Sequence, residues 1–181
     1  MKLLFASDIH GSALYCAELC RRIEEENPDK IVLLGDLLYH GPRNDLPKGY
    51  APKKVIALLN GYKERIIAVR GNCDSEVDQM VLQFPCMADY TSILTETAYT
   101  LFVTHGHLAD HKIPDTTNMD AYISGHTHIK QAERKEGVLF INPGSISIPK
   151  DTTHSYALYH EGNFILKELN GALIQNIALS K

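Results

Sequence analysis

The stretch KLLFASDIHG, residues 2–11, joins an apolar run directly to a polar cluster. Residues 2–7 are typical of a buried β-strand, and Asp8 and His10 follow them at once. Polar side chains at the end of a buried strand are costly unless they have a partner or a function. This stretch therefore predicts a strand that delivers functional side chains to its carboxyl end.

The same arrangement recurs four more times along the chain. Each further cluster follows or interrupts an apolar, strand-like run: Gly35-Asp36, Gly71-Asn72-Cys73-Asp74, His105-Gly106-His107 and Gly125-His126-Thr127-His128. The residue types that recur are Asp, His and Asn, which are metal ligands in proteins. Five such clusters indicate one shared metal site, built from the ends of several strands.

The first 72 residues repeat a strand–loop–helix unit. Ser12 can cap a helix with apolar positions at Ala13, Cys16, Ala17, Cys20 and Ile23, which Asn27-Pro28 ends. Further strands are expected at 30–34 and 65–69, a helix from about Pro52, and a short helix from Asp74 or Ser75 with Val77, Met80 and Val81 inward. Alternating strands and helices predict right-handed βαβ units and a parallel sheet, whose ligands bind at the carboxyl ends of the strands.

The second half of the chain has a different pattern. Strand-like segments separated by turn signals follow one another at 100–104, 121–124, 138–142, 156–159 and 164–169. We expect them to form a second, mainly antiparallel sheet packed on the first. With no linker-like segment visible, the expected organisation is one α/β (α+β) domain over residues 1–181.

Composition limits the classes of protein that are compatible with this chain. Its 181 residues are 44% hydrophobic and 22% charged, with a net charge of −4 and no basic block. This net charge argues against a protein that binds long nucleic acid through many phosphate contacts. No apolar run reaches the ~18 residues of a membrane span. The four cysteines form no C-x-x-C pair, which favours free thiols and a cytoplasmic location.

The metal-ligand assignment follows from strand geometry. Residues i and i+2 of an extended strand point to the same side, so Asp8 and His10 can reach one ion if the extended conformation persists past Ser7. His126 and His128 have the same relation. Asp36 can offer one carboxylate oxygen to each of two ions. The predicted set has seven members: Asp8, His10, Asp36, Asn72, His105, His126 and His128. A mixed oxygen and nitrogen set suits Mn²⁺, Fe²⁺, Zn²⁺ or Ni²⁺.

Each cluster also has an alternative reading when it is taken alone. A Gly-Asp pair after a strand is commonly a turn, and two histidines can lie in a turn without binding anything. The joint occurrence of five clusters, all at predicted strand ends, favours the metal site.

The clusters together resemble the calcineurin-like metallophosphoesterase superfamily. Its pattern D-x-H, G-D, G-N-H-[DE], H-G and G-H-x-H is matched in order over about residues 2–148, with Cys73 at the third position of G-N-H-[DE]. The chain is most similar to the small bacterial phosphodiesterases of this superfamily. Two further segments resemble theirs, His40-Gly41-Pro42-Arg43-Asn44 and Asn142-Pro143-Gly144-Ser145.

The resemblance implies a fold and a reaction. It implies two packed mixed β-sheets flanked by helices in a four-layer sandwich. One ion would be held by Asp8, His10, Asp36 and His128, the other by Asp36, Asn72, His105 and His126. It also implies a phosphodiesterase of small phosphoesters, using two divalent ions, Mn²⁺ first, and a metal-bridging hydroxide as the attacking group. Small members of the family self-associate, so a homo-oligomer is expected.

Several further residues are candidates for chemistry. We expect Cys73, Asp36 and Asn72 to be catalytic residues. The family pattern has a histidine at the position of Cys73, and a thiol is a poorer acid than the imidazolium of that histidine. Arg43 can contact a substrate phosphate, and His107 can orient the site. Substrate recognition is expected in residues 37–53 and 106–120. The alternatives are a phosphomonoesterase or protein phosphatase, and a non-catalytic interaction scaffold of the same fold.

Overall fold

The first half of the chain alternates strands with helices in the computed structural model, which describes residues 1–108 and 118–180. Three strands pair in parallel in the order β1-β2-β3: β1 (Lys2–Ala6), β2 (Lys30–Leu33) and β3 (Ile66–Ala68). The helical segments are α1 (Ala13–Glu26), α2 (Pro52–Asn60), the 3₁₀ helix η1 (Lys63–Arg65) and α3 (Glu76–Val81). The predicted parallel βαβ arrangement is confirmed.

Helix α1 begins and ends at the predicted residues. The Ser12 side chain accepts a hydrogen bond from the backbone N–H of Tyr15, and Asn27 adopts a left-handed conformation with φ 44° at the other end. Asn27 also donates its N–H to the carbonyl of Ile23, which satisfies one of the last carbonyls of the helix. The buried face carries Cys16, Leu19, Cys20 and Ile23, whereas Ala17 is exposed, against the prediction.

Helix α3 is present, but its predicted orientation is wrong. Val77 and Met80 are 64% and 82% exposed, and Val81 is exposed as well. Asp78 is instead buried, where its carboxylate accepts the backbone N–H of Ser75 in a capping box. In a helix of six residues this cap turns Asp78 inward, so the apolar residues are left facing outward.

The strands of the second half are divided between two sheets. The six-stranded sheet has the order β11-β10-β9-β1-β2-β3, because β9 (Ser155–His160) pairs antiparallel with β1. The strands β10 (Asn163–Glu168) and β11 (Leu173–Ala178) continue this sheet as antiparallel neighbours. The five-stranded sheet has the order β4-β5-β6-β8-β7, formed by β4 (Tyr90–Leu94), β5 (Thr100–Thr104), β6 (Ala121–Ile123), β7 (Gln131–Lys135) and β8 (Val138–Asn142).

The expectation of a mainly antiparallel second sheet is therefore wrong. The centre of the five-stranded sheet, β5-β6-β8, is parallel, and only its two edge pairs are antiparallel. The antiparallel strands β9, β10 and β11 extend the first sheet instead. Strands β4, β7 and β11 were not predicted. Each lies at the edge of a sheet with many exposed side chains, so its sequence lacks a buried apolar pattern.

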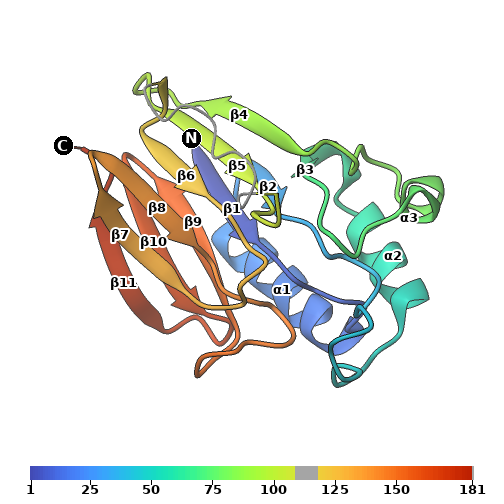
Figure 1. Ribbon diagram of the computed structural model, residues 1–181. Coiled ribbons are helices and arrows are strands. Elements are labelled where there is room, and N and C mark those ends of the chain that lie inside the picture. Colours follow the sequence, from blue (N-terminus) through green and yellow to red (C-terminus); the bar gives the residue numbers. More distant parts are fainter. Residues whose placement is uncertain (109–117, 181) are drawn as a thin grey trace.

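Two cores lie on the two faces of the six-stranded sheet. Leu4 and Ala6 of β1 face the core shared with α1 and α2, whereas Leu3 and Phe5 face the five-stranded sheet. Burial on both faces explains why β1 is a continuous apolar run. The α/β class with two packed mixed sheets is confirmed. In Figure 1 the helices gather on one side of the sheets, and a fourth layer of helices is not seen in residues 1–108 and 118–180. In the same ranges no helix has the length and apolar character of a membrane span.

Candidate metal centre

Five of the seven predicted ligands have left-handed backbone conformations. Their φ angles are 58° for Asp8, 47° for His10, 55° for Asp36, 65° for His126 and 60° for His128. The premise that an extended strand continues past Ser7 is therefore wrong, because β1 ends at Ala6 and the chain then enters this unusual conformation. Residues other than glycine that are held with positive φ are strained, and such strain concentrates at functional sites.

Hydrogen bonds from neighbouring loops hold the loop that carries Asp8 and His10. The backbone N–H of Asp8 donates to the carbonyl of Gly35 at 3.1 Å, and that of His10 to the carbonyl of Asp36 at 2.8 Å. The Ser145 and Ser147 hydroxyls both donate to the Asp8 carbonyl, at 2.9 and 3.1 Å. These bonds fix a strained backbone that would otherwise relax.

The loop with His126 and His128 is fixed in a similar way. The Asn142 side chain donates to the carbonyl of Gly125 at 2.8 Å and to the Thr127 hydroxyl at 3.1 Å. A side chain at Gly125 would collide with Ser7, so glycine is required for the close approach of this loop to the end of β1. The Asn142-Pro143-Gly144-Ser145 segment noted in the sequence therefore supports both strained loops.

Three histidines direct the same ring nitrogen, Nε2, toward the carboxylates of Asp8 and Asp36. The Nδ1 atoms of His10, His105 and His128 each lie 2.6–2.8 Å from a backbone carbonyl, those of Tyr39, Leu34 and Ile148 respectively. Because a carbonyl accepts only, each Nδ1 carries the proton and donates it. In the neutral imidazole the opposite nitrogen, Nε2, is then a bare lone pair. A carbonyl behind each ring is the usual way to fix the tautomer of a metal-binding histidine.

The atoms that converge are all acceptors. His10 Nε2 lies 3.2 Å from His128 Nε2, and His128 Nε2 lies 3.1 Å from Asp8 Oδ1. His105 Nε2 lies 3.1 Å from Asn72 Oδ1 and 3.5 Å from Asp36 Oδ2. Asp8 Oδ1 is buried without a hydrogen-bond partner. Lone pairs this close repel unless positive charge lies between them, so these residues fit divalent cations.

The pKa shifts of the site also indicate that it attracts positive charge. Burial acts to raise the pKa of Asp8, but His10 and His128 overcome it and hold the pKa below its ordinary value. Burial acts to lower the pKa of His105, but Asp36 and Asp8 raise it to about 9. Both shifts mean that the site attracts positive charge, whether protons or metal ions supply it.

His126 and His107 lie at the border of this cluster. The tight groups of ligand atoms are Asp8/His10/His128, Asp8/Asp36/His105 and His10/Asp36/Cys73, and His126 is in none of them. Its backbone N–H donates to Asp8 Oδ2 at 3.1 Å, and its ring centroid is 5.1 Å from that of His105. The His107 ring lies 5.3 Å from His105, with its Nδ1 buried and unpaired.

The sulfur of Cys73 faces the cluster. It belongs to the group with His10 and Asp36, and the Asn72 side-chain amide donates to it at 3.3 Å. Gly41 packs against it, since a Cβ there would come within 2.8 Å of the sulfur. Burial, followed by the Asp36 carboxylate, raises the pKa of Cys73 to about 12 in the metal-free chain.

Asp74 has a structural role that the sequence left open. It is not a helix N-cap, because Ser75 caps α3. Its buried carboxylate accepts the backbone N–H groups of Asp36, Leu37 and Gly71 at 2.7–2.8 Å. Asp74 thereby ties the loop after β2 to the loop after β3. A Cβ at Gly71 would collide with Asp36. The position of the Asp36 carboxylate therefore depends on a glycine at position 71 as well as on Asp74.

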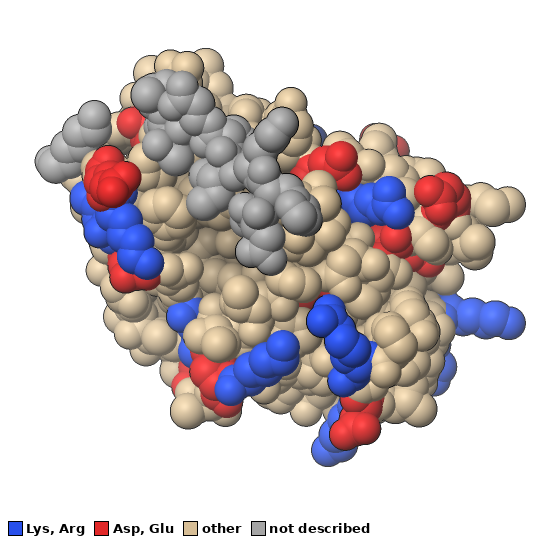
Figure 2. Space-filling view, viewed as in Figure 1, with Lys and Arg blue, Asp and Glu red and all other residues tan. Residues whose placement is uncertain are grey.

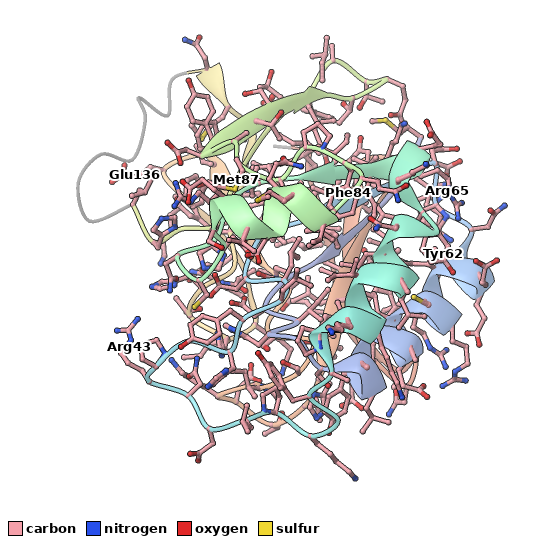
Figure 3. The ribbon with its side chains drawn as sticks, turned by 90° about the vertical axis from the view of Figure 1, so that its right-hand side faces the viewer. Arg43, Tyr62, Arg65, Phe84, Met87 and Glu136 are labelled. Carbon is pink, nitrogen blue, oxygen red and sulfur yellow. The ribbon has the colours of Figure 1, made fainter. Side chains whose placement is uncertain are left out.

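A cavity of about 830 Å³ opens beside the cluster. Its lining includes Asp36, Asn72, Cys73, His126 and His128, together with Arg43 of the loop after β2. Figure 3 shows Arg43 at the tip of this loop, at the edge of the molecule. The structure thus brings the predicted phosphate-binding arginine to the same cavity as the metal-ligand candidates. Residues 109–117 of the expected recognition loop 106–120 lie outside the described residues.

Comparison with known proteins identifies relatives over almost the whole chain. The calcineurin-like phosphoesterase superfamily domain matches residues 1–163. Phosphodiesterase YfcE of Escherichia coli (strain K12) is 49% identical over 151 residues, covering 83% of this chain and 82% of YfcE. The probable metallophosphoesterase YsnB of Bacillus subtilis (strain 168) is 30% identical over 169 residues, covering 87% and 83% of the two chains.

The fold agrees with a solved relative. The structure of Yfce, a phosphoesterase from E. coli, superposes with a TM-score of 0.94 at 43% identity, covering 99% of this chain and 100% of that one. The five clusters, the two mixed sheets and the sequence relatives lead to one assignment. The chain belongs to the calcineurin-like phosphoesterase superfamily.

Proposed function

We propose that this protein is a metal-dependent phosphodiesterase that hydrolyses small phosphodiesters at a centre of two divalent cations. The observation that carries the proposal is the convergence of three imidazole Nε2 atoms on two carboxylates. The relative named as a phosphodiesterase, at 49% identity, supports the type of reaction. Metal binding is in keeping with the family and with the three close groups of ligand atoms.

The assignment of ligands follows the geometry and the family pattern together. Asp8, His10, Asp36 and His128 would hold one cation, and Asp36, Asn72, His105 and His126 the other. Asp36 can serve both because its Oδ2 lies 3.6 Å from His10 Nε2 and 3.5 Å from His105 Nε2. Two such cations stabilise negative charge on a phosphoryl group and lower the pKa of bound water.

The side chains of the protein have separate tasks in this proposal. The carbonyls behind His10, His105 and His128 keep the nitrogen that faces the cations free of a proton. Asp74 keeps the Asp36 loop in place. The Cys73 sulfur lies beside the ligand candidates His10 and Asp36, and a thiol is a poorer proton donor to a leaving oxygen than an imidazolium. We therefore propose a preference for diesters with good leaving groups.

The identity of the metal belongs to the same proposal. Asp, Asn and His provide oxygen and nitrogen ligands, for which Mn²⁺ is our first expectation and Zn²⁺, Fe²⁺ and Ni²⁺ are alternatives. The test is to strip the protein of metal, add back each ion singly, and assay bis(p-nitrophenyl) phosphate and p-nitrophenyl phosphate. We expect diester hydrolysis to return with Mn²⁺ and to exceed monoester hydrolysis.

A matched pair of variants connects this activity to the centre. Asp36→Ala should lower diester hydrolysis about a hundredfold or more, because both cations lose a shared ligand. Asp45→Ala, an exposed carboxylate in the same loop, is the control and should leave the rate unchanged. Undiminished turnover in Asp36→Ala would refute the proposal.

We also propose the domain organisation, the location and the self-association of the protein. One domain over residues 1–181 is supported by a core that joins β1 and β2 to β5, β6 and β8. Four free cysteines, three of them buried, support a reducing, cytoplasmic location.

Self-association is supported by the edge strand β4, where Tyr90 and Leu94 are 61% and 70% exposed. Light scattering tests it, and a monomer at all concentrations would contradict it.

A further inference from the structure

The cavity beside the metal-ligand cluster has room for more than a phosphate group. Its volume of about 830 Å³ lies in the upper part of the range of small-molecule sites, roughly 300–1,000 Å³. The metal-ligand candidates Asp36, Asn72, His126 and His128 line only part of it. The remaining lining can therefore recognise substrate groups on either side of the reacting phosphorus.

Two partly exposed apolar side chains line this cavity. Tyr39 is 44% exposed and Ile129 is 50% exposed. Both are placed by the cluster itself, since the Tyr39 carbonyl accepts the Nδ1–H of His10 and Ile129 directly follows His128. Exposed apolar surface beside a metal-ligand cluster favours contact with a flat organic group such as a nucleobase.

Two unpaired cations line the same cavity. Arg43 and Lys150 have no ion-pair partner in the described part of the chain. The backbone N–H of Lys150 donates to the carbonyl of His128 at 3.0 Å, so this lysine is anchored beside a metal-ligand candidate. Its sequence neighbour Asp151 does not neutralise it, because Asp151 is paired with Lys130.

Arg43 and Lys150 are positively charged, whereas the whole chain has a net negative charge. The protein has a net charge of −4, yet the acids that line the cavity, Asp36 and Asp74, are held by the metal site and by backbone N–H groups. Figure 2 shows a largely uncharged area on one face, with Lys and Arg as well as Asp and Glu side chains at its margin. Beyond the cluster, the cavity thus offers two positive groups to an anion.

We propose that the substrate is a nucleotide-type phosphodiester that carries a second phosphate group. The metal centre would take the diester, Tyr39 and Ile129 would contact the base, and Lys150 with Arg43 would bind the second phosphate. This inference rests on the proposed phosphodiesterase function and narrows its substrate class. Lys150 is a new specificity residue in this account, because no sequence motif singled it out.

The test uses two substrates that differ only in the second phosphate. These are thymidine 3′-(p-nitrophenyl phosphate) with and without a 5′-phosphate, assayed by nitrophenolate release with Mn²⁺. In the wild-type protein we expect the 5′-phosphate to lower KM about fivefold, as two solvent-accessible ion pairs allow. Lys150→Met should reduce the KM ratio of the two substrates to about two, and Arg43→Met/Lys150→Met should bring it close to one. Lys54→Met, an exposed lysine of α2 that does not line the cavity, should keep the wild-type ratio.

A binding measurement on the metal-free protein gives a second readout. By calorimetry, thymidine 5′-phosphate should bind about fivefold more tightly than thymidine, and the difference should fall in Lys150→Met and vanish in Arg43→Met/Lys150→Met. A wild-type protein that cleaves bis(p-nitrophenyl) phosphate but has no preference for the 5′-phosphate would overturn this inference alone. A preference that persists in the double variant Arg43→Met/Lys150→Met would also overturn it. Failure to cleave bis(p-nitrophenyl) phosphate with any metal would overturn the proposed function as well.

Discussion

The Asp74 carboxylate accepts the backbone N–H of Asp36 at 2.8 Å, and this bond couples two loops that both supply metal-ligand candidates. The same carboxylate also accepts the N–H groups of Leu37 and Gly71. Asp36 lies at the end of β2, and Asn72 follows the end of β3. The distance between these two ligands thus depends on a residue that is not itself a ligand.

Asp74→Asn should weaken metal binding without removing a ligand. An amide has one acceptor oxygen, so it cannot accept all three N–H groups, and its NH₂ group would face a backbone donor. Loss of such a supporting partner lowers metal affinity about 10–100-fold in other sites. The measurement is the Mn²⁺ concentration that gives half-maximal diester hydrolysis, together with calorimetric Mn²⁺ affinity.

Asp78→Asn is the matched control for Asp74→Asn. Asp78 is also a buried carboxylate that accepts a backbone N–H, that of Ser75, but it caps α3 and bonds none of the N–H groups of Asp36, Leu37 and Gly71 that Asp74 holds. It should lower the melting temperature while leaving Mn²⁺ affinity as in the wild type. Equal losses of Mn²⁺ affinity in the two variants would show that Asp74 acts only through general stability.

Cys73→His should change which esters are cleaved. An imidazolium with an ordinary pKa near 6.5 donates a proton to an alkoxide far better than a thiol does. The rate with methyl p-nitrophenyl phosphate depends little on that proton, whereas a dialkyl phosphate depends on it strongly. We expect the dialkyl-to-aryl rate ratio to rise about tenfold or more.

Cys73→Ala tests whether a change in the rate ratio comes from proton donation or from the size and polarity of the side chain at this position. It removes the thiol without supplying an acid, so the dialkyl-to-aryl ratio should stay at the wild-type value or fall. If Cys73→His leaves the ratio unchanged, the leaving oxygen receives its proton from elsewhere, and the proposed preference for good leaving groups is wrong.

Glu26 gives a prediction on stability, remote from the metal centre. Its carboxylate accepts hydrogen bonds from Lys2 at 2.8 Å and from Tyr156 at 3.0 Å, and it is paired with Lys167. Burial acts to raise the pKa of Glu26, but Lys167 and Lys2 lower it to about 2 from the usual 4.5. A pKa that is lower in the folded state contributes stability above pH 4.5, which is lost as the pH falls toward 2.

Glu26→Gln should therefore destabilise the protein at pH 7 by about 2 kcal/mol, after allowance for solvent screening. The difference from wild type should shrink as the pH falls from about 4.5 to 2, which denaturant unfolding at several pH values can measure. Glu18→Gln, which breaks an exposed pair with Arg21 on the same helix, should change stability by less than about 0.5 kcal/mol. A difference for Glu26→Gln that is independent of pH would contradict the role assigned to this carboxylate.

The sequence predicted those parts of the fold that have a local signal. Ser12 and Asn27 mark the ends of α1, and the apolar runs mark β1, β2, β5 and β8. It predicted the wrong sheet for β9, which joins β1 in the first sheet. Antiparallel pairing of β9 with β1 joins residues more than 150 positions apart, and no local pattern encodes that contact.

The site was predicted by residue type and order more than by local geometry. Asp8 and His10 were expected to converge through an extended strand, yet they do so through left-handed residues that distant serines and carbonyls hold in place. The role of Asp74 was left open, and Tyr39 and Lys150 of the proposed substrate site were missed, for a similar reason. Each acts by its position beside a ligand candidate, which becomes visible only once the loops are folded together.

The most direct measurement is anomalous diffraction at the manganese edge from crystals grown with MnCl₂. The account predicts two manganese peaks, one among Asp8, His10 and His128 and the other among Asp36, Asn72 and His105, with Asp36 in contact with both. In crystals of Asp36→Ala both peaks should weaken strongly. Wild-type crystals with no manganese density at these side chains would contradict the central claim.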